Sequence, residues 1–201
     1  MKIYLRPITL KDGNFIVKWR NDEKVKSHCM TKGTVTEESN EAFFKANVET
    51  GKYKQFMVEC VDKDFPVVSY TIATVYLKDM DYDNKRCELC IFTSCDREWD
   101  SASQSEAIKM LVEKAFNEYG MHKVYSYVFA KFPEEIELLK NAGLAIEAIF
   151  ENEALNEKGE YEDIVRMSLC LINNIWILKS QYNQYSFLKE WYEKKIWAYF
   201  L

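Results

Sequence analysis

Two cysteines three positions apart, Cys87 and Cys90, have the spacing that most directly suggests chemistry, because a C-x-x-C motif can bind zinc or undergo reversible oxidation. A zinc site needs further ligands, and the sequence has no second C-x-x-C and only two histidines, His28 and His122. The surrounding segment also alternates like a strand, where positions three apart point to opposite faces. We therefore expect two structural thiols and no metal site.

The composition is that of an ordinary globular protein and argues against several functional classes. The 201 residues fit one domain, and a net charge of -5 disfavours nucleic-acid binding, which needs a basic surface. No apolar run is long enough to span a membrane, and the first residues lack a secretory signal, so we predict a cytoplasmic protein with no membrane partner. In that compartment the six cysteines should be buried thiols: Cys29, Cys60, Cys87, Cys90, Cys95 and Cys170.

The elements that would position functional residues follow from periodicity and from helix-end signals. Ser103 and Glu106 have capping-box spacing before an apolar helical stripe, and Gly120 stands where that helix should end. In chain order we expect a strand at 3–6, helices after Thr9 and over 37–49, a three-strand antiparallel meander within 53–92, a helix ending at Gly120, a strand at 124–129, a helix at 134–141 and strands at 145–151 and 161–171. This order, β-α-α-β-β-β-α-β-α-β-β, predicts an α+β fold with helices over a mixed, largely antiparallel sheet.

The order of elements resembles that of the GNAT N-acyltransferases, and short segments strengthen the resemblance over residues 3–171. They are most similar to the branch containing ribosomal-protein N-terminal and amino-sugar acetyltransferases. The matching segments are Leu5-Arg6-Pro7, Trp19-Arg20-Asn21, Glu88-Leu89-Cys90-Ile91, Glu106-Ala107, residues 115–124, residues 138–144 and residues 159–169. The resemblance implies a domain over 1–171 that binds acetyl-CoA as co-substrate.

In such enzymes the acyl-CoA arm lies between the fourth and fifth strands, paired with fourth-strand backbone. The corresponding residues here are Ile91, Phe92 and Thr93. A loop at the start of the next helix holds the pyrophosphate with backbone N–H groups. The corresponding loop residues are Ser101, Ala102, Ser103, Gln104 and Ser105.

This loop departs from the pattern of the family. Asp100, Ala102 and Gln104 stand where glycines are usual, and glycine lets bare backbone approach the phosphates. Asp100 also adds a negative charge near an anionic ligand, which is unfavourable unless its side chain turns away or caps the helix. The serines and Gln104 could donate hydrogen bonds in compensation. The departure motivates an alternative hypothesis, a catalytically inactive GNAT-fold protein that serves in binding or scaffolding.

The resemblance also suggests catalytic roles. Glu88 is the candidate general base, acting through water, and its alternative role is that of a solvated carboxylate or a structural ion-pair partner. The usual acid is a tyrosine, but the matching position is Leu139. Either solvent protonates the thiolate or a tyrosine such as Tyr125, Tyr127 or Tyr161 substitutes.

Trp19, Arg20 and Asn21 are the candidate acceptor-binding residues, because the segment between the first two helices covers the substrate in these folds. Arg20 would suit a phosphate or carboxylate, whereas Trp19 is expected mainly to pack in the core. The expected acceptor is a primary amine of a small molecule, such as an amino sugar or a polyamine, or a peptide N-terminus.

Residues 172–201 lie beyond the matched region and form a predicted C-terminal amphipathic helix. Aromatic and aliphatic residues recur at helical spacing from Tyr185 to Tyr199. We favour packing of this helix on its own domain. A homodimer contact and a membrane-surface helix are the alternatives, and the mixed charges of the polar face disfavour the last.

Overall fold

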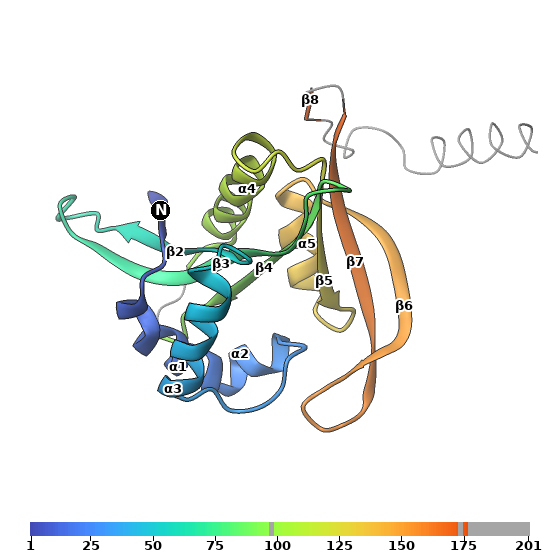
Figure 1. The fold of residues 1–201 in the computed structure, drawn as a ribbon, viewed down its shortest axis with the longest axis horizontal. Helices are drawn as coiled ribbons and strands as arrows, with labels where there is room; N and C mark the ends of the chain where they lie inside the picture. Colours follow the sequence, from blue (N-terminus) through green and yellow to red (C-terminus); the bar gives the residue numbers. More distant parts are fainter. Residues whose placement is uncertain (97–98, 173–174, 177–201) are drawn as a thin grey trace, which may run out of the picture.

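The computed structural model describes residues 1–96, 99–172 and 175–176. Seven strands form one sheet in the order β1-β2-β3-β4-β5-β7-β6, and β8 pairs with β7 (Figure 1). The strands are β1 (Ile3–Pro7), β2 (Lys54–Val61), β3 (Ser69–Asp81), β4 (Arg86–Thr93), β5 (Lys123–Phe129), β6 (Ala145–Leu155), β7 (Tyr161–Ile172) and β8 (Ile175–Trp176). Every neighbouring pair is antiparallel except β4 and β5, which are parallel.

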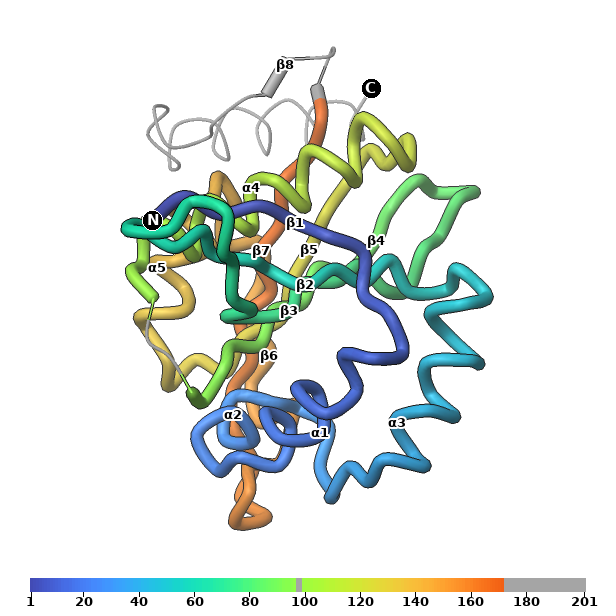
Figure 2. The backbone as a smooth tube through the Cα atoms, turned by 90° about the vertical axis from the view of Figure 1, so that its left-hand side faces the viewer, coloured from blue at the N-terminus to red at the C-terminus, as the bar shows by residue number. Residues whose placement is uncertain are grey.

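Helices cover both faces of the sheet. Figure 2 shows α1 and α3 on one side of strands β1–β3 and α4 on the other. The helical segments are η1 (Leu10–Asp12), α1 (Gly13–Asn21), α2 (Glu23–His28), α3 (Glu37–Phe43), its π-helical continuation η2 (Phe44–Val48), α4 (Ser101–Asn117) and α5 (Pro133–Asn141).

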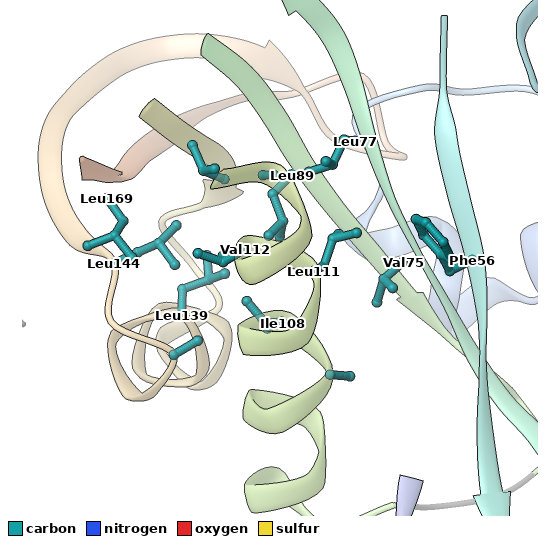
Figure 3. Packing of buried hydrophobic residues seen from close by; sticks show 14 of the residues in the cluster. Phe56, Val75, Leu77, Leu89, Ile108, Leu111, Val112, Leu139, Leu144 and Leu169 are labelled. Carbon is teal, nitrogen blue, oxygen red and sulfur yellow. The ribbon is translucent and has the colours of Figure 1, made fainter. Parts of the chain in front are cut away.

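The larger core lies between the sheet and α4. Ile108, Leu111 and Val112 follow one another at helical spacing and face the apolar side chains of the strands, among them Val75 and Leu89 (Figure 3). All five of these side chains are fully buried. Burying an aliphatic side chain contributes about 1.5–3 kcal/mol, so this interface fixes α4 on the sheet.

A smaller core lies on the opposite face and holds α1 and α2. It is built around Trp19 and includes Met57 and Phe92. Met57 stands between Phe56 and Val58, which both belong to the larger core, because neighbouring strand residues point to opposite faces. The alternation along β2 therefore anchors both helical layers.

The predicted order of elements and the mixed, largely antiparallel sheet are confirmed, with α2 and β8 as additions. One predicted helix cap is wrong. α4 begins at Ser101 and its N-cap is Asp100, whose carboxylate accepts the Ser103 backbone N–H at 2.8 Å. Ser103 is therefore inside the first turn, where its hydroxyl donates to Asp100 instead of capping the helix.

Among the described residues, no helix is long and apolar enough to cross a membrane. The aromatic stripe from Tyr185 to Tyr199 lies outside the described residues. Packing of that segment on the domain, its use in a homodimer and the cytoplasmic location stay predictions.

Candidate active site

The parallel strands β4 and β5 separate partway along their length. Their pairing consists of Arg86 with Lys123, Cys87 with Val124 and Glu88 with Tyr125. Both strands are fully described, and beyond Glu88 and Tyr125 they no longer pair with each other. β5 instead continues along β7 as far as Phe129, which leaves one edge of the last five residues of β4 open.

The open edge of β4 presents backbone donors at alternate positions. The Ser94 N–H donates to the Ile72 carbonyl at 2.8 Å, and the β3–β4 register continues from that pair. In an antiparallel ladder, hydrogen-bonded and non-bonded pairs alternate, so the backbone of Phe92 faces β3. The N–H groups of Ile91 and Thr93 therefore face the opening. The Phe92 side chain lies in the smaller core, on the face of the sheet opposite the larger core.

Three neighbouring cavities lie along the opening, and we name them by position. The α4 cavity, of ≈ 630 Å³, includes Thr93, Ser94, Trp99 and Gln104 in its wall. The central cavity, of ≈ 120 Å³, includes Glu88, Cys90, Tyr127 and Leu139. The aromatic cavity, of ≈ 300 Å³, includes Phe43, Tyr53, Tyr76 and Phe92.

Shared wall residues show that the three cavities are neighbours, and we call the row of cavities the passage. His28, Ile91 and Glu135 line both the central and the α4 cavity. Arg20 and Tyr76 line both the central and the aromatic cavity. The central cavity, beside the open edge of β4, therefore lies between the α4 cavity and the aromatic cavity.

Glu88 lies in the central cavity with only 11% of its side chain exposed. Its carboxylate contacts Lys78 Nζ at 3.0 Å and accepts from the Cys90 thiol at 3.3 Å. Burial alone would lower the pKa of Lys78, but Cys90 and Glu88 hold it above its ordinary value, so the lysine stays charged. Glu88, the candidate general base, therefore also forms an ion pair, which was the alternative role expected for it.

The two cysteines of the C-x-x-C motif lie on opposite faces of β4. Cys87 is fully buried in the larger core, whereas Cys90 lines the central cavity and donates to the Glu88 carboxylate. Burial raises the pKa of both thiols. Among the described residues, no group of three or more His, Cys, Asp or Glu side chains could hold a metal ion.

His28 and Glu135 form a pair that the sequence did not indicate. His28 Nδ1 contacts the Glu135 carboxylate at 2.7 Å, and the imidazole stacks on Phe132 with ring centroids 3.8 Å apart. The hydrogen bond to Glu135 raises the pKa of His28 against the opposing effect of burial. The partners belong to α2 and α5, so no local sequence pattern could have joined them.

The N-terminus of α4 borders the α4 cavity through Gln104. Asp100 is the N-cap of α4, and its carboxylate accepts a hydrogen bond from the Ser103 N–H. This hydrogen bond lowers the pKa of Asp100. Ser101 and Ala102 are exposed in the first turn, where helix N–H groups have no partner within the helix.

The remaining predicted loop side chains are engaged within the protein. The Gln104 amide donates to the Trp99 carbonyl at 3.0 Å. The Ser105 hydroxyl is buried and donates to the Leu138 carbonyl at 3.3 Å. Of the five predicted loop residues, Ser101 and Ala102 therefore retain the backbone donors that could hold an anion.

Trp19, Arg20 and Asn21 have three different environments. Trp19 is 0% exposed and donates from Nε1 to Asp96 at 3.1 Å, which places it in the core. Asn21 forms two hydrogen bonds to the backbone of Val35, of 2.7 and 2.9 Å, and so holds the segment before α3. Arg20 alone of the three lines the cavities.

The three tyrosines considered as the general acid lie in different environments. Leu139 is buried and lines the central cavity. Tyr127 also lines this cavity. The Tyr125 ring lies under the Arg166 guanidinium, 4.4 Å from its carbon. Tyr161 is 66% exposed at the start of β7.

Comparisons with known proteins agree with this architecture. Residues 2–145 match the family model described as "Acetyltransferase (GNAT) domain". The spermidine N-acetyltransferase of Vibrio cholerae, solved with CoA and spermine, superposes with a TM-score of 0.75 at 20% identity, over 84% of this chain and 95% of that one. A chimera of that enzyme with hSSAT gives a TM-score of 0.70 at 20% identity, over 85% and 96% of the two chains. No curated protein sequence matches.

Proposed function

We propose that this chain, which belongs to the acetyltransferase (GNAT) family by the match over residues 2–145, transfers an acetyl group from acetyl-CoA to a primary amine. The observation that carries the proposal is the separation of β4 from β5 beyond Glu88, which leaves the N–H groups of Ile91 and Thr93 facing a passage. A closed ladder at this place would leave no backbone donors for a thioester.

The residues present fit the acetyl-CoA co-substrate, although fewer donors hold its diphosphate than the family pattern predicts. The open edge of β4 supplies backbone partners for the extended arm. The first turn of α4 supplies the N–H groups of Ser101 and Ala102 for the diphosphate. Because Asp100 is engaged as a helix cap, its charge is directed to the α4 N–H groups and partly offset by them.

In the proposed reaction the amine nitrogen bonds to the acetyl carbonyl carbon, the carbon–sulfur bond breaks, and the amine proton leaves. Backbone N–H groups at Ile91 and Thr93 stabilise the negative charge that develops on the carbonyl oxygen. The passage holds the two reactants in contact, which contributes to rate by proximity.

Glu88 is our candidate for the group that accepts the amine proton through water. It lies in the central cavity, where its carboxylate contacts Lys78 Nζ at 3.0 Å. Tyr127 is our candidate for protonating the departing sulfur, because it is the one of the three proposed tyrosines that lines this cavity. The acceptor is a small-molecule amine or a peptide N-terminus bound through the aromatic cavity.

A second candidate function is binding without catalysis, and the environment of the α4 cavity motivates it. Asp22, Asp96, Glu134 and Glu135 line this cavity, whereas Lys24 is the one lysine among the described residues of its wall. Asp100 also occupies a donor at the helix start. Carboxylates around an anionic ligand weaken its binding.

A thermal-shift titration with acetyl-CoA, followed by a thiol-release assay with amines, separates the two functions. A ligand at a hundred times its Kd stabilises the folded state by about 2.7 kcal/mol. A transferase will show a saturable shift and acceptor-dependent thiol release. No shift at millimolar acetyl-CoA contradicts the proposal and favours the non-catalytic function.

A further inference from the structure

We infer that the acceptor is an amine that carries an anionic group and an aromatic or other apolar substituent, with the anion bound by Arg20 and the substituent in the aromatic cavity. This inference deepens the proposed function and rests on it in one respect: the aromatic cavity holds the acceptor. It excludes the polycationic amines that appear in the names of the structural neighbours.

The wall of the aromatic cavity is largely apolar and contains no carboxylate. Its sixteen lining residues, all within the described part of the chain, include no Asp or Glu, and its charged members are Arg20 and Lys78. Lys78 is paired with Glu88 at 3.0 Å. A polyamine would therefore bring several positive charges to a wall that has no anion for them and already has an uncompensated cation.

The aromatic side chains form a continuous row along this cavity. Phe43 meets the edge of Tyr53 at 5.1 Å, Tyr53 stacks on Tyr76 at 5.8 Å, and Tyr76 meets Phe92 at 6.3 Å between ring centroids. Such rings offer a flat apolar substituent contact area and favourable edge-to-face geometry. Phe92, the last of these four rings that line the cavity, belongs to β4, the strand with the open edge.

Arg20 differs from the other arginines that the structure describes. Arg6, Arg86 and Arg166 each lie within 4.0 Å of a carboxylate. Arg20 has no such carboxylate among the described residues, and its guanidinium donates only to neutral partners, the Cys29 thiol at 2.9 Å and the Thr31 hydroxyl at 2.6 Å. Because arginine stays charged and has five N–H donors, donors remain for an anion.

The position of Arg20 fixes where the anion lies relative to the amine. Arg20 and Tyr76 line both the central and the aromatic cavity, and Glu88 lies in the central one. An amine near Glu88 with an apolar substituent among the rings would place a carboxylate near Arg20. An aromatic α-amino acid has this arrangement, since its amine, carboxylate and ring diverge from one carbon.

The test uses the full chain and three probes: L-phenylalanine, phenethylamine, which lacks the carboxylate, and spermidine. Binding is measured by calorimetry without acetyl-CoA, and kcat/KM is measured with it. We expect L-phenylalanine to exceed phenethylamine by about 10- to 100-fold, the range of a charge-assisted hydrogen bond, and spermidine to be the poorest acceptor. The inference is overturned if kcat/KM for phenethylamine or spermidine equals or exceeds that for L-phenylalanine. It is also overturned if L-phenylalanine does not bind at millimolar concentration.

Three variants separate anion recognition by Arg20 from its structural contact to Thr31. Arg20→Gln should remove the preference for L-phenylalanine over phenethylamine. Arg86→Gln is the matched control, because Arg86 lies outside the cavities and is paired with Asp81, and it should keep the preference. Thr31→Val removes one contact of Arg20 and should also keep the preference. An equal loss for both amines in Arg20→Gln assigns Arg20 a structural role and contradicts the inference, and the wild-type comparison stands even if this variant does not fold.

The outcomes also separate this inference from the proposed function. Binding of L-phenylalanine that depends on Arg20, with no binding of acetyl-CoA, supports the inference and contradicts the transferase. Turnover of acetyl-CoA with spermidine alone contradicts the inference and supports the transferase.

Discussion

His28 and Glu135, separated by 107 positions in the sequence, are joined by a contact of 2.7 Å between imidazole Nδ1 and carboxylate Oε1. His28 ends α2, and Glu135 lies in the first turn of α5. Since both side chains line the central and α4 cavities, the pair connects two helices at the wall of the passage.

The His28–Glu135 pair should make stability depend on pH near neutrality. The pKa of His28 is raised above its ordinary 6.5, with Glu135 as the main cause, Glu134 adding to the rise and Lys131 opposing it. The stabilisation is therefore fully present below pH 6.5 and is lost as the pH rises through the folded-state pKa. Glu135→Gln should lower the free energy of unfolding, measured in urea, by up to about 1 kcal/mol at pH 6 and by less at pH 8.5.

Glu134→Gln is the control for this pair, because Glu134 acts on His28 only through its charge. It should change the unfolding free energy less than Glu135→Gln does at pH 6. If Glu135→Gln lowers the free energy of unfolding equally at both pH values, the pair does not depend on the charge of His28, which would contradict this prediction.

Replacing Glu88 tests the proposed base. Glu88→Gln should lower kcat/KM by about 100-fold or more, the usual contribution of general base catalysis, while the Kd of acetyl-CoA changes little. Glu113→Gln, an exposed position on α4, serves as the matched control for the charge. Unchanged kcat/KM in Glu88→Gln would leave Glu88 as a structural partner of Lys78 alone.

The charge of Asp100 should oppose diphosphate binding. Asp100→Asn keeps a side chain that can cap α4 and removes the negative charge, so the Kd of acetyl-CoA should fall about two- to fivefold at low salt and less at high salt. Calorimetry at two ionic strengths measures this effect. Weaker binding in Asp100→Asn would mean that the carboxylate helps the site, for example by holding Ser103.

Proline substitutions distinguish the two edges of β4. Ile91→Pro removes an N–H that faces the opening, whereas Phe92→Pro removes one that faces β3. Phe92→Pro should lower the melting temperature much more than Ile91→Pro does. Ile91→Pro should still weaken acetyl-CoA binding, and equal destabilisation by the two variants would contradict the assigned alternation.

The sequence predicted the elements better than their contacts. The apolar stripe that contains Ile108, Leu111 and Val112 identified α4 because helical periodicity is a local property. The cap of α4 was misassigned because Asp100 and Ser103 both begin plausible capping patterns, and the structure shows that Asp100 accepts from Ser103.

The site could be predicted only in part, for a physical reason. The family resemblance located β4 and the first turn of α4, but it could not show which backbone N–H groups face the opening, since that depends on the register with β3. His28 and Glu135 carry no motif and meet only through the tertiary fold. Arg20 was indicated by its type, whereas its lack of a carboxylate partner among the described residues required coordinates.

Amide hydrogen exchange along β4, with and without acetyl-CoA, tests the central claim most directly. We predict that the Phe92 amide is protected in the free protein by β3, and that the Ile91 and Thr93 amides become protected only when acetyl-CoA is added. Unchanged exchange at Ile91 and Thr93 in saturating acetyl-CoA would contradict the claim that the opening beside β4 holds the thioester.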